Sequence, residues 1–246
     1  MDTAGREYPG YEPMKVVRLL AAVALAALLV PSTGSALPSH HPDPADFVAH
    51  VDNPWFPLRP HTTYVYRGVK DGQPSRDVFK ATARTRTIEG VRCTVVRDRL
   101  YLRGRLEERT VDWYAQDSGG NVWYFGEATA ELRRDGSVRS TEGSWQAGVN
   151  GARAGIFMPG SPHVGQSGRQ ELFAGHAEDH FRVLSLQATV RTPAASSRHA
   201  LLTREWTPLE PGVVDHKLYV RGIGNVLEKT VMGGDELNEL VAIRRG

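Results

Sequence analysis

The sequence has little cysteine and no familiar catalytic motif. Cys93 is its one cysteine, so no disulfide can form within the chain and core packing alone must hold the fold. The sequence contains no His-Glu-x-x-His zinc motif, no Gly-x-Ser-x-Gly nucleophile elbow and no acidic calcium loop. These absences favour a binding role over catalysis, although they leave the question of enzymatic activity open.

An excess of charge of one sign is also missing. Thirty Lys and Arg residues stand against 28 Asp and Glu residues, which gives a formal net charge of +2. A strongly basic balance is the usual mark of proteins that bind nucleic acid. We therefore expect no nucleic-acid partner.

The sequence has a single long apolar run, Leu19–Val30, close to its start. Basic residues precede the run, Pro31 ends it, and small residues at 34–36 offer a cleavage site, as in a secretory signal peptide. We predict a cleaved signal over residues 1–36 and a secreted or cell-envelope location. An uncleaved anchor is the alternative, and Met14 is an alternative start to Met1. No cysteine follows the run that could carry a lipid.

Residues 62–246 are rich in β-forming residues separated by tight-turn dipeptides. Alternating or β-branched runs bounded by Asp-Gly, Glu-Gly and Arg-Gly indicate an antiparallel meander. The expected strands are 62–69, 76–87, 91–102, 105–116, a strand ending at 132, 137–145, 169–173, 179–191, 198–207, 216–221, 225–231 and 237–244. We predict a mainly β, single-domain curved antiparallel sheet or open (half) β-barrel.

Residues 37–61 form an arm before this domain. We expect a short helix near Ala45–Val51, capped by Asp43 or Asp46. In Asn53–Leu58, two prolines bracket Trp55 and Phe56, which disfavours helix and regular strand. We predict that the two aromatic residues dock into the core as a plug. A docking knob for a cell-envelope partner is the alternative.

Two segments of the sequence suggest a ligand cavity. Gln146–Gly168 is long and glycine-rich, and we expect an irregular lid or crossover loop. The strand beginning at Val122 is apolar on both faces, so both must be covered, one by the core and the other by this loop or by an apolar ligand. The predicted ligand-lining residues are Trp123, Tyr124, Phe125, Trp145, Phe157 and Met158.

A short histidine motif offers a different reading. His176, Glu178 and His180 would project from one face if they lie on a strand, and zinc accepts both His and carboxylate ligands. This predicts a metal site, with zinc as the alternative to a protein without a cofactor. If the segment is a turn, the motif is a polar turn instead.

Three phrases of the sequence resemble an uncharacterised family of exported actinobacterial β-proteins. They are Asp112–Glu127, Asn53–Leu58 and Tyr219–Val226. The meander with its late Gly-x-Gly-x-Val strand is also loosely similar to half-barrel lipoprotein carriers and lipid carriers, which implies a curved sheet around an apolar cavity. The first family has no established activity, so the resemblance transfers no functional residue.

Together these features predict an exported carrier or binding protein for an apolar or amphipathic, lipid-like small molecule. Two alternatives remain: a metal-dependent hydrolase with a His/Glu/His site, and a cell-envelope structural or interaction module. The sequence indicates neither the ligand nor the oligomeric state.

Overall fold

The computed structural model describes residues 42–246. The predicted signal peptide and the first residues of the arm lie outside the described residues. Among residues 42–246, no helix is long and apolar enough to cross a membrane.

The described chain consists almost entirely of β-strands. A 3-10 turn, η1 (Pro44–Asp46), precedes sixteen strands. The first eight are β1 (Phe47–Val48), β2 (Thr62–Lys70), β3 (Gln73–Ile88), β4 (Val91–Leu102), β5 (Arg105–Asp117), β6 (Val122–Leu132), β7 (Val138–Ser140) and β8 (Trp145–Gln146). The others are β9 (Arg153–Met158), β10 (Ser167–Arg169), β11 (Glu171–Leu172), β12 (His180–Arg191), β13 (Ser196–Trp206), β14 (Val214–Val220), β15 (Gly224–Met232) and β16 (Leu237–Arg245).

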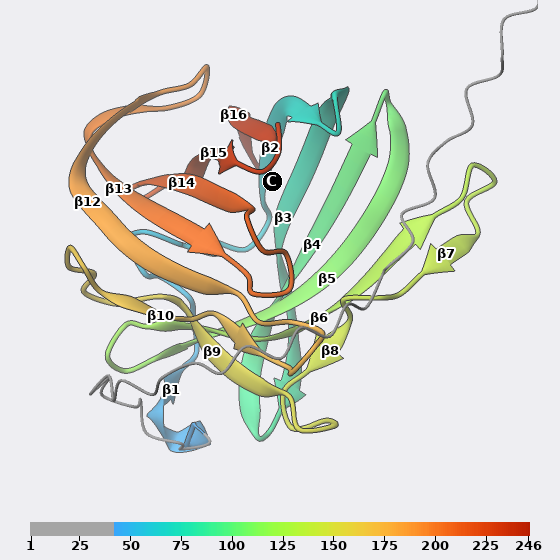
Figure 1. The fold of residues 1–246 in the computed structure, drawn as a ribbon. Helices are drawn as coiled ribbons and strands as arrows, with labels where there is room; N and C mark the ends of the chain where they lie inside the picture. The colour runs from blue at the N-terminus through green and yellow to red at the C-terminus, as the bar shows by residue number, and fades with distance from the viewer. Residues whose placement is uncertain (1–41) are drawn as a thin grey trace, which may run out of the picture. The chain divides into compact units, whose positions relative to one another are not determined.

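The strands form one antiparallel sheet that curls into a nearly closed barrel (Figure 1). The strand order is β10-β12-β13-β14-β15-β16-β2-β3-β4-β5-β6-β9-β11, with β1 paired to β5 and both β7 and β8 paired to β6. The chain's last strand, β16, therefore lies beside β2, which closes the path between the two halves. The predicted mainly β, curved or barrel-like fold is confirmed.

Three tight turns set the register of the β2–β5 meander. Each is a two-residue turn whose residues both have positive φ: Asp71-Gly72, Glu89-Gly90 and Arg103-Gly104. This backbone matches the right-handed twist of antiparallel strands, and glycine tolerates it without steric cost. The sequence predicted all three turns and the strands that they join to within a few residues.

The two ends of the sheet meet at Gln170. This residue separates β10, which pairs with β12, from β11, which pairs with β9. Its backbone N–H donates to the Asp179 carbonyl at 2.8 Å, and its Nε2 donates to the Phe157 carbonyl at 3.3 Å. A buried glutamine thus bridges the gap where the ladder of backbone hydrogen bonds is interrupted.

The prediction that Gln146–Gly168 is an irregular loop is wrong in its middle part. β9 lies within it and pairs with β6. Gly155 is needed there, because a Cβ at this position would lie 2.5 Å from the Arg169 carbonyl oxygen. The small residue marks a close approach of two strands.

Two shorter elements also differ from the sequence-based expectation. Residues 137–145 do not form one strand but the separate strands β7 and β8. The expected helix near residue 45 is only the single turn η1, and β1 follows it directly. Asp43 does cap this turn, since its Oδ1 accepts a hydrogen bond from the Ala45 N–H at 2.9 Å.

The segment Asn53–Leu58 is the plug that the sequence predicted. Trp55 and Phe56 are 7% and 6% exposed and belong to the main core cluster, so they are not a free docking knob. Asn53 anchors the segment. Its Nδ2 donates to the carbonyls of Gly120 and Pro159, and its Oδ1 accepts from the Trp55 N–H at 2.8 Å.

The two faces of β6 lie in different surroundings. Trp123 and Phe125 both pack against the ring of Phe47 in edge-to-face contacts, at centroid distances of 6.1 and 5.6 Å. Tyr124 points the other way and stacks on Tyr114 at 4.7 Å. The expectation that both faces of this strand are covered is confirmed, and the cover is protein on each side.

We predict that Asn53→Ala lowers the free energy of unfolding by about 2–4 kcal/mol, because it leaves buried backbone groups of the plug without partners. Urea unfolding followed by tryptophan fluorescence measures the change. His50→Ala, a substitution at an exposed position just before the plug, is the control and should have no effect. Equal stability of the two variants would show that the plug does not depend on Asn53.

Candidate functional site

Three of the cavities among the described residues have volumes of about 190, 210 and 290 Å³. The first two share four lining residues: Asp77, Asp98, Glu228 and Asn238. Lys217 lies between the first and the third. The first two cavities are therefore adjoining parts of one hollow, and we take them as the candidate site.

One end of this hollow is aromatic. Phe56 of the plug packs on Phe157 of β9 at a centroid distance of 4.6 Å and edge-on to Tyr114 of β5 at 5.2 Å. Further rings come from β2, β3 and β14. The aromatic lining consists of Phe56, Tyr64, Tyr66, Phe79, Tyr114, Phe157 and Tyr219.

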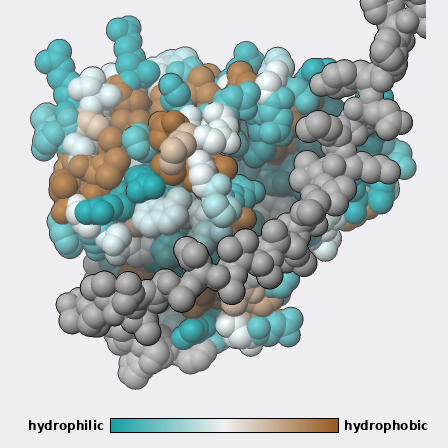
Figure 2. Space-filling model, viewed as in Figure 1, coloured by the Kyte–Doolittle hydropathy of each residue, from teal (hydrophilic) through white to brown (hydrophobic). Residues whose placement is uncertain are grey.

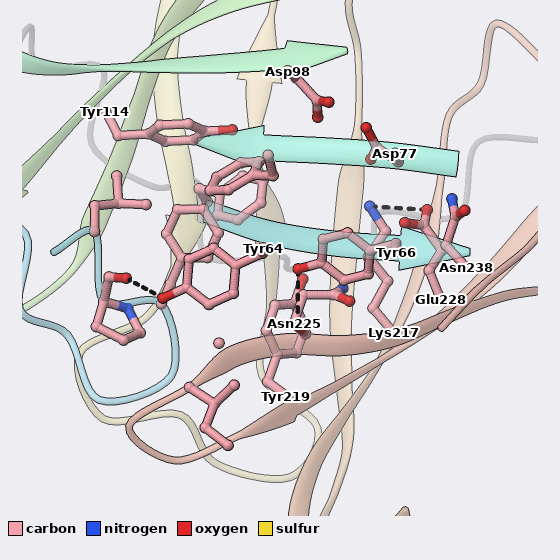
Figure 3. Close-up of a pocket in the computed structure, with 17 residues that line it drawn as sticks. Tyr64, Tyr66, Asp77, Asp98, Tyr114, Lys217, Tyr219, Asn225, Glu228 and Asn238 are labelled. Carbon is pink, nitrogen blue, oxygen red and sulfur yellow. Dashed lines mark hydrogen bonds and ion pairs between the residues drawn. The ribbon is translucent and has the colours of Figure 1, made fainter. Parts of the chain in front are cut away.

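The other end is lined by carboxyl groups, which we call the acidic band. The band consists of Asp77, Asp98, Glu108, Asp112, Glu127, Glu228 and Glu236. Figure 3 shows Asp77 and Asp98 turned toward each other on one side of the hollow, with Tyr66, Glu228 and Asn238 beside them. A molecule in the hollow would thus touch aromatic rings and carboxyl groups at the same time.

Strand alternation explains how acidic residues reach the interior. On β5, Glu108, Thr110 and Asp112 line the second cavity and Tyr114 lines the first. Successive side chains of a strand point to opposite faces, so every second residue of β5 faces inward. The same period places Asp77 and Phe79 of β3 inside. The acidic and the aromatic lining residues therefore occupy successive inward-facing positions of the same strands.

Two lysines form ion pairs with only two of the carboxyl groups in the acidic band. Lys70 pairs with Glu236 at 3.1 Å, and Lys217 pairs with Glu228 at 3.3 Å and with Glu205 at 3.1 Å. Among residues 42–246, no ion pair reaches the other members of the band. Those members are Asp77, Asp98, Glu108, Asp112 and Glu127.

Three polar oxygen atoms in the hollow lack a hydrogen-bond partner within the described chain. They are Oδ1 of Asp77, Oδ1 of Asp98 and Oδ1 of Asn238, and all three are buried. Buried polar atoms are rarely left without a partner, because the loss of hydration costs about 1–3 kcal/mol for each. A proton between the facing carboxyl groups of Asp77 and Asp98 lets the two acids hydrogen-bond to each other, so the Asn238 Oδ1 is the acceptor that stays without a partner.

Burial keeps several of these carboxyl groups protonated at neutral pH. Burial, with Asp98 nearby, raises the pKa of Asp112 to about 8, although the Tyr124 hydroxyl donates to its Oδ1 at 2.8 Å and opposes the shift. Burial and the proximity of Asp112 raise the pKa of Glu127 to about 9. Burial and the adjacent Asp98 raise the pKa of Asp77 well above its usual range. Asp77, Asp112 and Glu127 are therefore acids whose proton a bound cation would displace.

The structure separates the six predicted ligand-lining residues. Phe157 lines the aromatic end. Tyr124 and Trp145 lie behind that lining, ring against ring at 5.5 Å, and Met158 is buried in the core. Trp123 and Phe125 are on the opposite face of β6, against the ring of Phe47, and line none of the three cavities.

The three residues of the predicted metal site do not lie on one face of a strand. Residues 174–176 form a turn, so His176, Glu178 and His180 do not project from one strand face. His176 stacks on Phe173 at 4.4 Å and His180 stacks on Trp206 at 5.4 Å. Within residues 42–246, no group of three or more His, Cys, Asp or Glu residues is arranged to hold a metal ion.

The sequence analysis did not predict the acidic band, and Glu108 was not among the candidate site residues. The period-two spacing of Glu108, Thr110 and Asp112 was available as a signal. It pointed to one face of a strand but not to the inside of a barrel. The neighbouring Glu107 does not line the hollow and pairs with Arg105.

Comparisons with known proteins leave the family open. No family model matches the chain, and no curated protein matches it. Two solved structures are similar over most of their length. A predicted exported protein with a YmcC-like fold from Bacteroides fragilis has 14% identity and a TM-score of 0.45, covering 78% of this chain and 99% of its own. A predicted lipoprotein from Parabacteroides distasonis has 9% identity and a TM-score of 0.39, covering 77% and 98%.

We predict that the protein loses stability as the pH rises from about 4 to 9. The folded-state pKa of Asp112 lies above its unfolded value, so folding takes up a proton, and this contribution is present at low pH and lost through pH 8. Each group that titrates in this way contributes a slope of about 1.4 kcal/mol per pH unit. Urea unfolding at a series of pH values measures it.

Asp112→Asn tests the assignment, because the amide oxygen can still accept the Tyr124 hydroxyl but carries no titrating group. The variant should show a flatter dependence on pH than the wild type. Glu107→Gln, on the same strand but outside the hollow, should leave the slope unchanged. Parallel curves for wild type and Asp112→Asn would contradict the raised pKa of Asp112.

Proposed function

We propose that this chain is an exported binding protein that holds a small amphipathic molecule inside the barrel. The observation that carries the proposal is the hollow with an aromatic lining at one end and the acidic band at the other. Ligand sites typically combine a mostly apolar wall with a few polar groups that orient the ligand. The export part of the proposal rests on the signal-like residues 1–36 of the sequence.

The shape of the hollow favours a ligand of limited size. Cavities of about 190 and 210 Å³ that share a wall accommodate a ring or short chain with a polar end. The plug closes the aromatic end, because Phe56, Pro57 and Leu58 all line the first cavity. The apolar part of a ligand would lie against the plug.

The polar end of the ligand would lie in the acidic band. A purely apolar chain would bury these carboxyl groups without any partner, at a cost that its own burial would have to offset. The sequence-based prediction of a lipid-like ligand is therefore narrowed to an amphipathic molecule with a defined polar group. On the face seen in Figure 2, hydrophobic side chains gather most densely at the upper left, among hydrophilic ones.

We predict that Ile223→Trp lowers the affinity for an amphipathic probe at least tenfold, because Ile223 lines the first cavity and the larger ring would occupy it. Isothermal titration calorimetry with 4-phenylbutanol and 4-phenylbutylamine measures binding. Val231→Trp adds the same ring at a position that is 46% exposed on the same hairpin and should leave binding unchanged.

Binding that survives Ile223→Trp at full affinity would place the ligand elsewhere and contradict the proposal. A complementary measurement is native mass spectrometry of protein secreted by its own host. The proposal predicts a bound small molecule that dissociates on denaturation, and Ile223→Trp should be recovered without it.

A further inference from the structure

We propose that the polar end of the ligand is an organic cation, an ammonium or guanidinium group, held at Asp77, Asp98 and Asn238. This inference rests on the proposed function, because it assigns the chemistry of the molecule in the same hollow. It concerns the charge of the ligand and not the existence of the site.

Two adjacent acids of the hollow have no cationic partner among the described residues. Asp77 on β3 and Asp98 on β4 come from hydrogen-bonded neighbouring strands, where Asp77 is opposite Leu100, two residues from Asp98. Their carboxyl groups face each other in the hollow (Figure 3). Two carboxylates so placed repel each other unless a proton or a cation lies between them.

The unpartnered polar atoms in the hollow are hydrogen-bond acceptors. Asn238 is 8% exposed, and its Nδ2 donates to Glu236 Oε1 at 3.2 Å, which fixes the side chain with Oδ1 toward the hollow. Once the proton shared by Asp77 and Asp98 has left, the free atoms of the three side chains are all oxygens that accept hydrogen bonds. A ligand that satisfies them must supply several N–H or O–H donors from one point, as an ammonium or guanidinium group does.

Aromatic rings lie next to these oxygens. Tyr66 and Tyr219 line the same cavity as Asp77 and Asp98, and the Tyr66 hydroxyl already donates to the Asn225 carbonyl at 3.0 Å. Their ring faces attract cations and also contact apolar groups. Carboxyl groups and tyrosine rings together fit an amine better than they fit a neutral or anionic polar end.

The two lysines of the hollow are not available to neutralise these acids. Lys70 is held by Glu236, and Lys217 is held between Glu205 and Glu228. A metal ion is also a poor fit, because the described residues contain no group of three ligating side chains in position. An organic cation with its own apolar body meets both ends of the hollow.

Binding of a cation should release protons. The charged or titratable groups that face Asp77 are Asp98 on β4, Tyr66 on β2 and Glu228 on β15, with Lys217 on β14 beside Glu228. Burial, Asp98 and Glu228 disfavour the ionised form of Asp77, whereas the backbone N–H of Val78 favours it. A bound ammonium replaces the proton that Asp77 would otherwise hold, so affinity should rise with pH until the amine itself loses its charge.

The test compares three ligands that each carry a phenyl ring on a chain of four carbons: 4-phenylbutylamine, 4-phenylbutanol and 4-phenylbutyrate. Isothermal titration calorimetry on the full chain should give an affinity for the amine at least tenfold above that for the alcohol at pH 8, with the butyrate weakest. The ratio of amine to alcohol affinity should increase from pH 6 to pH 8.

The outcomes separate this inference from the proposed function. Equal affinities for amine and alcohol, both lost in Ile223→Trp, would overturn the cationic assignment and leave the binding site in place. Failure of all three ligands to bind would count against both. Magnesium, calcium and zinc chloride serve as further probes, and competition by any of them would indicate a metal site instead.

A double variant locates the cation. Asp77→Asn with Asp98→Asn keeps the side-chain shape but removes the charge, so the amine should lose its advantage while the affinity for the alcohol stays within about twofold. Glu107→Gln removes a carboxylate from β5 outside the hollow and should keep the full preference. Circular dichroism confirms folding, and an unchanged preference in the double variant would contradict the inference.

Discussion

The alternation of side chains along a closed, curved sheet is the constraint on which the rest of this structure depends. Once β16 lies beside β2, every second residue of each long strand must face the interior. On β5 this rule turns a surface-like sequence of acids and hydroxyls into the wall of a hollow, and the same rule continues the wall into Tyr114. The interior is therefore polar at one end because the strand sequence changes character along its length.

The plug and the bridge at Gln170 make this interior usable as a site. Asn53 fixes the plug to the β5–β6 turn and to the end of β9, so the aromatic end has a floor. Gln170 links the two ends of the sheet where their ladder stops. The result is a hollow whose apolar end is closed by hydrogen-bonded segments, while five members of the acidic band have no ion-pair partner among the described residues. The positive charge that the acidic band lacks is the charge that we assign to the ligand.

The sequence predicted most of the long strands, the three tight turns and the plug, because each depends on local signals, but it missed β9 and joined β7 and β8 into one strand. Asp-Gly and related dipeptides specify tight turns, and prolines around Trp55 and Phe56 exclude regular structure. The acidic band could not be predicted in the same way, since it joins residues from β3, β4, β5, β6, β15 and the segment just before β16. A near-neutral net charge also concealed the fact that acids gather inside. Trp123 and Phe125 were wrongly placed in the ligand site. The sequence indicates that both faces of their strand are covered, but it does not indicate which face points into the barrel.

The central claim is that Asp77, Asp112 and Glu127 are protonated near neutral pH, because burial and neighbouring acids raise their pKa values. Carbon-detected NMR titration of the side-chain carboxyl signals tests this directly. The account predicts that Asp112 and Glu127 titrate near their raised pKa values of about 8 and about 9, and that 4-phenylbutylamine shifts the Asp77 signal toward the ionised form. Titration of these groups near pH 4, with no response of Asp77 to the amine, would contradict it.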